Sequence, residues 1–284
     1  MPLHTQFIKI SDKKMAYYDL GNPNAPAILM GHSYLWDKTM WREQFDALSS
    51  QYRLIVPDLW AHGESEGLPV TPTTITIRRI AEDNWQLMQK LAIDRFAIIG
   101  LSIGGMWGTQ IALDHPDNVT ALVLMGTFVG AEPPESQEAY TALMSQFKTA
   151  HGFTEPLIEA IWPYFYSKKL SKASPLIDEL KARLRNIPKD KIDDIFTIGK
   201  SIFSRESNLE KLASLHIPLA IMIGEDDIGR PPSESEQMAK AANTKNLYYI
   251  KDAGHISVLE QPNDVNQYLL RFLETCPINI NNTI

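Results

Sequence analysis

Short apolar runs and longer amphipathic stretches alternate along the first 126 residues of the chain. The apolar runs are typical of buried strands and lie at 27–30, 52–56, 96–99 and 121–125. Apolar residues recur at helical spacing at 41–48, 75–91 and 103–115. Two further alternating stretches predict an N-terminal β-hairpin at 7–10 and 14–19. Because strands and helices alternate, we expect a parallel sheet with helices on both faces.

The pattern changes after residue 129, where strand-like runs give way to helical stretches. These stretches lie at 135–150, 155–165, 175–185 and 191–203. The alternation then resumes with strands at 219–223 and 247–250 and helices at 233–242 and 262–275. We therefore predict an α/β protein with a mostly parallel, eight-stranded, doubly wound sheet. Residues 1–129 and 209–284 form its core, and residues 130–208 form an inserted helical cap.

Composition narrows the classes of partner. The 284 residues carry a formal net charge of −7 and no long basic run, which argues against nucleic acid or an anionic membrane. Cys276 is the one cysteine, so we expect no internal disulfide and no cysteine-rich metal site. The N-terminus lacks the features of a signal peptide, and no apolar run is long enough to cross a membrane. We expect a cytoplasmic protein, monomeric or homodimeric.

One stretch around Ser102 carries the most specific chemical signal. Gly100-Leu101-Ser102-Ile103-Gly104 follows an isoleucine-rich strand and precedes a helix, which is the context of a nucleophile elbow. The serine would occupy a strained turn, and side chains at positions 100 and 104 would crowd the neighbouring strand and helix. Ser102 is therefore the candidate nucleophile.

A serine needs a histidine base to become a good nucleophile. His255 follows a strand and Gly254 near the C-terminus, where a loop returns to the edge that carries the elbow. Its rivals are His32 and His62, which also lie in loops at that edge. For His32 we expect a bracing role through hydrogen bonds, and for His62 a role in organising its own loop. We therefore predict that His255 is the base.

The base in turn needs a carboxylate that orients it, and in this topology the chain order is serine, acid, histidine. Glu225, Asp226 and Asp227 all follow the predicted strand at 219–223. Asp227 stands one turn beyond the strand end, four residues before Pro231. We favour Asp227 over Asp226.

Two backbone N–H groups are candidates for binding a developing oxyanion. The N–H of Ile103 lies at a helix N-terminus directly after the nucleophile. The second donor is expected from the loop after Met30, where the N–H of Tyr34 is our candidate. The side chains that we expect to line the substrate pocket are His32, Ser33, Trp60, Phe128, Trp162 and Tyr166. For the cap aromatics, packing onto the core is the alternative interpretation.

With these residues placed, the chain resembles the α/β-hydrolase superfamily over nearly its whole length. The segments that carry the resemblance are 31–33, 57–65, 100–105, 224–231 and 253–255. Ser33 stands where that superfamily usually has glycine, and Trp60-Ala61 replaces the common Pro-Gly. The loop from Ser33 to Trp41 is similar to the corresponding loop of 3-oxoadipate enol-lactonases. A serine at position 102, in place of aspartate, argues against haloalkane dehalogenase and epoxide hydrolase chemistry.

These residues predict a serine hydrolase that cleaves a small ester or lactone through an acyl-enzyme intermediate. His255 takes the proton of Ser102, Asp227 orients the imidazole, and the N–H groups of Ile103 and Tyr34 hold the oxyanion. We expect no metal and no organic cofactor. The alternatives are a dedicated lactonase for enol-lactones or acyl-homoserine lactones, a carbon–carbon bond hydrolase, and a signal-binding protein with low turnover.

Overall fold

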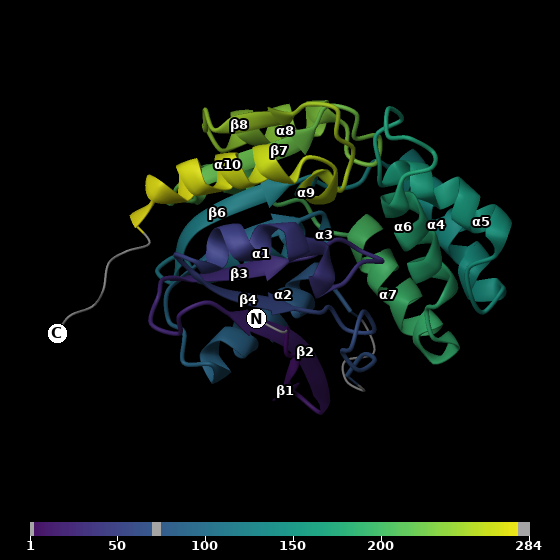
Figure 1. The fold of residues 1–284 in the computed structure, drawn as a ribbon, viewed down its shortest axis with the longest axis horizontal. Helices are drawn as coiled ribbons and strands as arrows, with labels where there is room; N and C mark the ends of the chain where they lie inside the picture. Colours follow the sequence, from purple (N-terminus) through teal and green to yellow (C-terminus); the bar gives the residue numbers. More distant parts are fainter. Residues whose placement is uncertain (1–2, 70–74, 278–284) are drawn as a thin grey trace.

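An eight-stranded, mostly parallel sheet organises the molecule (Figure 1). The computed structural model describes residues 3–69 and 75–277. The strand order is β1-β2-β4-β3-β5-β6-β7-β8. The strands are β1 Gln6–Ile10, β2 Lys13–Leu20, β3 Ala27–Gly31, β4 Arg53–Pro57, β5 Phe96–Leu101, β6 Val119–Met125, β7 Leu219–Gly224 and β8 Leu247–Ile250. β2 pairs antiparallel with β1 and β4, whereas the remaining neighbours are parallel.

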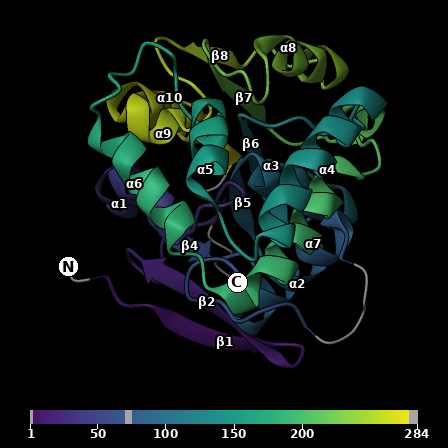
Figure 2. The same ribbon diagram turned by 90° about the vertical axis from the view of Figure 1, so that its right-hand side faces the viewer.

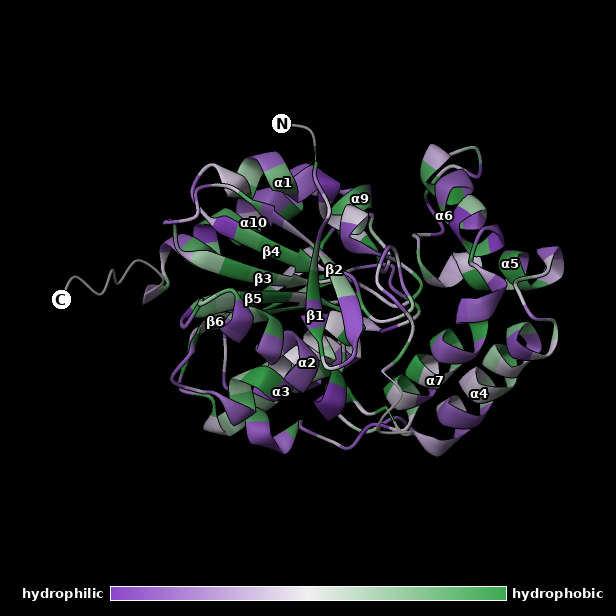
Figure 3. Cartoon of the chain, turned by 90° about the horizontal axis from the view of Figure 1, so that it is seen from below, coloured by the Kyte–Doolittle hydropathy of each residue, from purple (hydrophilic) through white to green (hydrophobic). Residues whose placement is uncertain are grey.

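Helices cover both faces of the sheet (Figure 3). On one face lie α1 Arg42–Ser49, α9 Ser257–Glu260 and α10 Pro262–Glu274, and on the other lie α2 Ile77–Lys90 and α3 Ile103–Asp114. α8 Pro232–Ala241 packs against β7. The central strands β3, β5, β6 and β7 are buried along their whole length, as their continuous apolar runs predict. α3 is also buried from Ile103 to Ala112, so its N-terminus is held firmly within the core.

Four helices are inserted between β6 and β7 at the carboxyl ends of the parallel strands (Figures 1 and 2). They are α4 Pro134–Thr149, α5 Glu155–Ile161, α6 Pro175–Arg185 and α7 Ile192–Phe203. We call the segment from α4 to α7 the cap. Short 3-10 helices complete the chain at η1 Lys38–Trp41, η2 Trp162–Tyr164, η3 Lys189–Lys191 and η4 Glu210–Ser214.

Two arginine–carboxylate ion pairs join α6 of the cap to the core. Arg42, at the start of α1, makes a bidentate pair with Glu179 of α6 at 2.8 and 3.0 Å. One helical turn further along α6, Arg183 pairs with Asp37, which also caps η1 by accepting the N–H of Thr39. Arg183 holds the pKa of Asp37 at about 2, although burial opposes this shift. One end of α6 is thus fixed beside the loop after β3.

The predicted sheet and helices are confirmed, with differences at a few ends. The helix expected to reach Phe165 ends at Ile161 and continues as η2, which contains Pro163. α9 was not predicted, since a single turn carries no periodic pattern. The division of the chain at residues 130 and 208 stays a prediction. The polar composition of residues 277–284 predicts a frayed tail, and this segment lies from residue 278 onward outside the described residues.

Across residues 3–69 and 75–277, no helix has both the length and the apolar character needed to cross a membrane.

Candidate active site

Ser102 sits in a strained turn between β5 and α3. Its φ is +59° and its ψ is −121°, a conformation that non-glycine residues rarely adopt. The N–H of Ser102 donates to the carbonyl of Met125 at 2.9 Å. The carbonyl of Ser102 accepts the hydroxyl of Thr127 at 2.7 Å. Because both backbone groups are hydrogen-bonded, the neighbouring strand holds the strained turn in place.

The glycines beside Ser102 are required by close approach of backbone to backbone. A Cβ atom on Gly104 would overlap the carbonyl of Gly31 in β3, and one on Gly100 would overlap the carbonyl of Gly104. The elbow can therefore pack against β3, and the chain can turn from β5 into α3, only without side chains at these positions. This agrees with the expectation drawn from the motif.

His255 and Asp227 form a buried hydrogen-bonded pair. The Nδ1 of His255 lies 2.8 Å from Oδ2 of Asp227. The other carboxylate oxygen, Oδ1, accepts the backbone N–H groups of Gly229 and Arg230, each at 2.9 Å. Asp226 points elsewhere and accepts the hydroxyl of Ser167 at 2.6 Å. Three donors hold the Asp227 carboxylate, which fixes the orientation of the imidazole.

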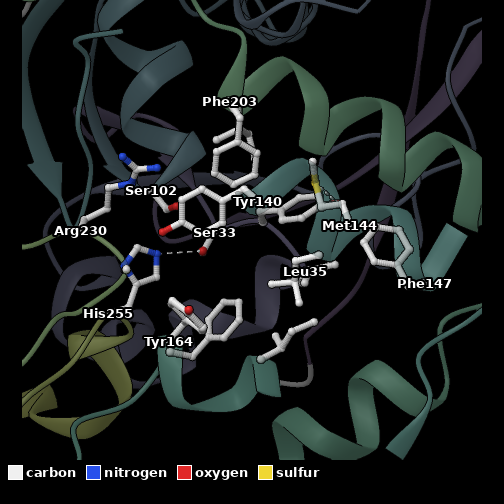
Figure 4. Close-up of a pocket in the computed structure, with 16 residues that line it drawn as sticks. Ser33, Leu35, Ser102, Tyr140, Met144, Phe147, Tyr164, Phe203, Arg230 and His255 are labelled. Carbon is white, nitrogen blue, oxygen red and sulfur yellow. Dashed lines mark hydrogen bonds between the residues drawn. The ribbon is translucent and has the colours of Figure 1, made fainter. Parts of the chain in front are cut away.

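The Nε2 atom of His255 faces the same cavity as Ser102 (Figure 4). In this structure its hydrogen-bond partner is the hydroxyl of Ser33, whose Oγ lies 3.4 Å away. Three side chains that can exchange hydrogen bonds, those of Ser33, Ser102 and His255, therefore line one end of the cavity.

Glu260 supports the loop that carries His255, and sequence reasoning did not identify it. Its carboxylate accepts the N–H of Gly254 at 2.6 Å and that of Ser167 at 2.8 Å. Burial raises the pKa of Glu260 to about 7, although both N–H groups oppose this shift. The residue fastens the histidine loop to the segment after η2. A lone acidic residue at the end of a short helix gives no sequence signal for such a role.

The two candidate oxyanion donors come from different elements. The N–H of Ile103 lies in the first turn of α3, where N–H groups have no partner within the helix. Tyr34 lies in the loop after β3, and its side chain lines the cavity. Its phenol donates to the carbonyl of Ile195 in α7 at 2.8 Å. The loop that carries the second donor is therefore tied to the cap.

His32 braces the loop after β3, as expected. Its Nδ1 bonds the carbonyl of Ser33 at 2.7 Å, and its Nε2 accepts the N–H of Leu59 at 2.9 Å. Burial lowers the pKa of His32 to about 4 and that of His62 to about 3. His62 contacts the carbonyl of Trp60 through Nδ1 at 2.8 Å. Both rings are therefore neutral at pH 7 and belong to the support of the site.

The cavity lies between the core and the cap and has a volume of about 110 Å³ (Figure 4). Its core side carries Ser33, Ser102 and His255, and its cap side is formed mainly by apolar and aromatic side chains. α4 contributes four of these side chains, Tyr140, Leu143, Met144 and Phe147. Because these residues are three and four positions apart, they form an apolar stripe on one face of the helix. From this pattern the sequence predicted the helix but not its contact with the cavity.

Of the six side chains expected in the substrate pocket, the structure places Ser33 on this cavity. The other five contribute elsewhere, which corrects the expected lining. His32 braces its loop, and Trp60 is buried against Asp83. Phe128 lies beside Arg205, and a separate groove is lined by Trp162 and Tyr166. The indole of Trp60 donates to Asp83 at 2.8 Å, and the phenol of Tyr166 to the carbonyl of Leu176 at 3.1 Å. Aromatic character alone did not distinguish cavity lining from packing.

Within the described parts of the chain, no group of three or more histidine, cysteine, aspartate or glutamate side chains has an arrangement that could hold a metal ion.

The fold and this site agree with the comparisons to known proteins. A family model described as the alpha/beta hydrolase fold matches residues 26–262. The chain belongs to this family. The α/β-hydrolase resemblance seen in the motifs is thereby confirmed, together with the fold that it implies.

Relatives of this α/β hydrolase include esterases and lactonases. The chain is 25% identical to 3-oxoadipate enol-lactonase 1 of Acinetobacter baylyi, over 90% of this chain and 91% of that protein. A thermophilic esterase from Thermogutta terrifontis is 25% identical, with a TM-score of 0.85 over 95% of this chain and 98% of the esterase chain. The structure of the enol-lactonase from Burkholderia xenovorans has a TM-score of 0.81, over 95% of this chain and 100% of the lactonase chain. At 23% sequence identity, this similarity shows that the two chains share a fold. These similarities support a hydrolase.

Proposed function

We propose that this α/β hydrolase is a serine carboxylic ester hydrolase acting on small, uncharged esters through an acyl-enzyme intermediate. The observation that carries the proposal is the His255–Asp227 pair at 2.8 Å, with Nε2 directed to the cavity that Ser102 also lines. A serine in a strained strand-to-helix turn, a histidine and an orienting carboxylate are the three parts of nucleophilic acyl transfer.

The proposed reaction has two halves. His255 accepts the proton of Ser102 through Nε2 while the serine oxygen attacks the carbonyl carbon, and the alcohol leaves with that proton. Water then gives a proton to Nε2 and attacks the acyl carbon, and the serine oxygen recovers the proton. The N–H groups of Ile103 and Tyr34 hold the oxyanion in both halves, each worth about 3 kcal/mol.

The cavity supports a small apolar acyl group. An engineered cavity of about 150 Å³ holds one benzene molecule. A volume of about 110 Å³ therefore accommodates a chain of about four to six carbons. The apolar cap side chains favour a hydrocarbon over a polar group, because a polar group would lose its hydrogen bonds to water there.

Charge in the cavity supports an uncharged substrate. Among the described residues that line the cavity, Arg230 carries the one permanent positive charge. Its guanidinium is paired with the buried carboxylate of Glu132 at 2.8 Å, and Arg205 contacts the same carboxylate oxygen at 2.8 Å. Glu234 lies 3.4 Å from the other end of the Arg230 guanidinium. Because Arg230 is already neutralised, a substrate carboxylate would find no free cation here.

A dedicated lactonase is the second candidate, favoured by the similarity to 3-oxoadipate enol-lactonase 1 over 90% of the chain. The same chemistry opens a lactone ring, since its carbonyl carbon is also attacked by serine. Because Arg230 is already paired with carboxylates, lactones that carry a carboxylate are disfavoured, whereas uncharged lactones fit. Rates on p-nitrophenyl butyrate, an uncharged lactone and a lactone with a carboxylate would separate the two candidates.

The direct test replaces the proposed nucleophile. We expect Ser102→Ala to lower turnover of p-nitrophenyl butyrate by about 10⁴-fold or more. The matched control is Ser201→Ala, which removes a buried hydroxyl that donates to the carbonyl of Ile198 at 2.7 Å, on the cap. Near-wild-type turnover by a folded Ser102→Ala protein, with melting temperature and circular dichroism unchanged, would disprove the serine mechanism.

A further inference from the structure

The proposed reaction makes no use of the Ser33 hydroxyl, which lies beside the histidine in the cavity. Its Oγ is the hydrogen-bond partner of His255 Nε2, at 3.4 Å. In the proposed reaction, Nε2 is the atom that receives a proton first from Ser102 and later from water. Any role of this contact in the reaction rests on the proposed function.

The backbone around Ser33 is fixed, so its hydroxyl has a defined position. The carbonyl of Ser33 bonds His32 Nδ1 at 2.7 Å and accepts the N–H of Trp36 at 3.1 Å. The residue is only 1% exposed. Ser33 is therefore held as firmly as the bracing histidine beside it, and the contact with His255 does not depend on a mobile loop.

The imidazole on the other side of this contact is also fixed. Asp227 holds Nδ1 at 2.8 Å, and the ring of Phe165 packs edge-on against the imidazole with centroids 5.9 Å apart. With the Nδ1 proton donated to Asp227, neutral His255 presents a lone pair at Nε2, and the Ser33 hydroxyl donates to it. At 3.4 Å this hydrogen bond is at the long end of the range and therefore weak.

Water is hard to hold in this cavity. An ordered water needs two to four polar partners, and the cap side offers mostly hydrocarbon and aromatic rings. The Ser33 hydroxyl lies within hydrogen-bond distance of Nε2, and Ser102 lines the same cavity. In the acyl-enzyme, the oxygen of Ser102 is esterified and no longer donates. Ser33 is then the hydroxyl that remains beside the base.

We propose that Ser33 is a positioning residue for the hydrolytic water in the second half of the reaction. The water replaces the weak Ser33–His255 hydrogen bond: it donates one proton to Nε2 and the other to Oγ of Ser33, so that a lone pair points at the acyl carbon. The first proton moves to Nε2 as the carbon–oxygen bond forms, and it passes to Ser102 Oγ as the ester bond breaks. Ser33 itself neither gains nor loses a proton during this step.

The test is a competition between water and methanol for the acyl-enzyme. The variants Ser33→Ala and Ser33→Gly both remove the hydroxyl, and Ser33→Thr keeps one. With p-nitrophenyl butyrate and methanol as competing nucleophile, we measure methyl butyrate against butyric acid. Methanol has a single O–H, so it cannot bond Nε2 and Ser33 as donor at once. We expect the ester-to-acid ratio to rise about five- to tenfold in both hydroxyl-free variants and to stay near the wild-type value in Ser33→Thr.

A second measurement separates water positioning from general damage to the site. Labelling of Ser102 by a fluorophosphonate reports the first half of the reaction, in which water takes no part. We expect labelling by the alanine and glycine variants at least as fast as by the wild type, because Nε2 loses a competing donor. Ser201→Ala serves as the buried-hydroxyl control and should change neither readout.

The outcomes distinguish this proposal from the proposed function. An unchanged product ratio in both hydroxyl-free variants overturns the role of Ser33, and so does a loss of labelling equal to the loss of turnover. If Ser33→Thr fails to fold, agreement between the alanine and glycine variants decides. A wild-type protein that labels at no serine and forms no acyl-enzyme overturns the proposed function itself.

Discussion

The cavity has two walls of opposite character. We call the side that carries Ser33, Ser102 and His255 the core wall, and the side formed by the cap the cap wall. The core wall is built from hydrogen bonds and strained backbone, since Leu35 and Ser102 have φ values of +64° and +59°. The cap wall is built from side-chain packing, as in the stacking of Tyr140 on Phe203 with ring centroids 4.2 Å apart.

The difference separates two tasks. Hydrogen bonds are directional, so a wall made of them holds reacting groups within tenths of an ångström. Apolar packing is not directional, and its selectivity depends on volume and shape. We therefore expect changes in the core wall to abolish reaction, and changes in the cap wall to alter which substrate reacts.

The largest expected effect is in the core wall. Asp227→Asn should lower kcat for p-nitrophenyl butyrate by about 10⁴-fold, because an amide no longer fixes the imidazole in the required tautomer. Steady-state kinetics at pH 7 provide the measurement. The neighbouring carboxylate supplies the control: Asp226→Asn changes a side chain that bonds Ser167, and it should stay within about threefold of the wild type. Equal losses in the two variants would contradict the assignment of the acid.

The second prediction concerns acid stability of the core-wall supports. Burial lowers the pKa of His32 to about 4 and of His62 to about 3, whereas unfolded histidine titrates near pH 6.5. Below about pH 6.5 these two side chains therefore bind more protons in the unfolded state than in the folded one. Each ring lowers the free energy of unfolding as pH drops towards 4, by roughly 3 kcal/mol.

Urea unfolding from about pH 7 down to pH 4 measures this effect. In His62→Gln the side chain carries no charge at any pH, so its stability should fall less steeply with acid than that of the wild type. A His62→Gln protein whose unfolding free energy falls with acid as steeply as that of the wild type would rule out a buried neutral His62.

A smaller effect is expected in the cap wall. Phe203→Ala enlarges the cavity beside Tyr140, so the ratio of kcat/KM for octanoate over butyrate p-nitrophenyl esters should rise by about tenfold. Leu184→Ala is the control, since Leu184 is buried in the cap and lies outside the cavity lining. That control should lower stability and leave the ratio unchanged. No shift in the Phe203 variant would mean that this wall does not set chain length.

The smallest expected effect lies at the join between the walls. The pair between Arg42 and Glu179 is about one-third exposed on both sides, so it contributes at most about 1 kcal/mol. Glu179→Gln should lower the melting temperature by less than about 4 °C and leave kcat/KM unchanged. A large loss of activity would show that this single contact holds the cap in its working position.

The core was predictable because its constraints are local. The turn at Ser102 needs glycines at fixed offsets, and the buried strands need continuous apolar runs. His255 and Asp227 each follow a strand, and the ends of parallel strands meet at one edge. Chain order and spacing therefore make these residues candidates before any contact is known.

The cap lining was not predictable in the same way. Trp162 and Tyr166 have the composition of pocket residues, yet they face another groove, whereas the stripe from Tyr140 to Phe147 lines the cavity. Which face of a cap helix turns to the cavity depends on contacts between residues distant in the sequence, such as the stacking of Tyr140 on Phe203. Periodicity finds an apolar stripe but does not say what covers it. The Ser33–His255 contact likewise joins residues 222 positions apart and has no local signal.

Tyr34 belongs to both regions at once. Its backbone N–H is the proposed second oxyanion donor, and its phenol hydrogen-bonds the carbonyl of Ile195 within the cap. In protein engineering, this makes residue 34 part of the module that must be exchanged when a cap is transplanted between relatives. In a foreign cap, the carbonyl that replaces that of Ile195 could lie at a different position relative to the core. The Tyr34 hydrogen bond would then displace the loop that carries the proposed oxyanion donor. In a chimaera, the residue at position 34 and the cap should therefore be taken from the same parent protein.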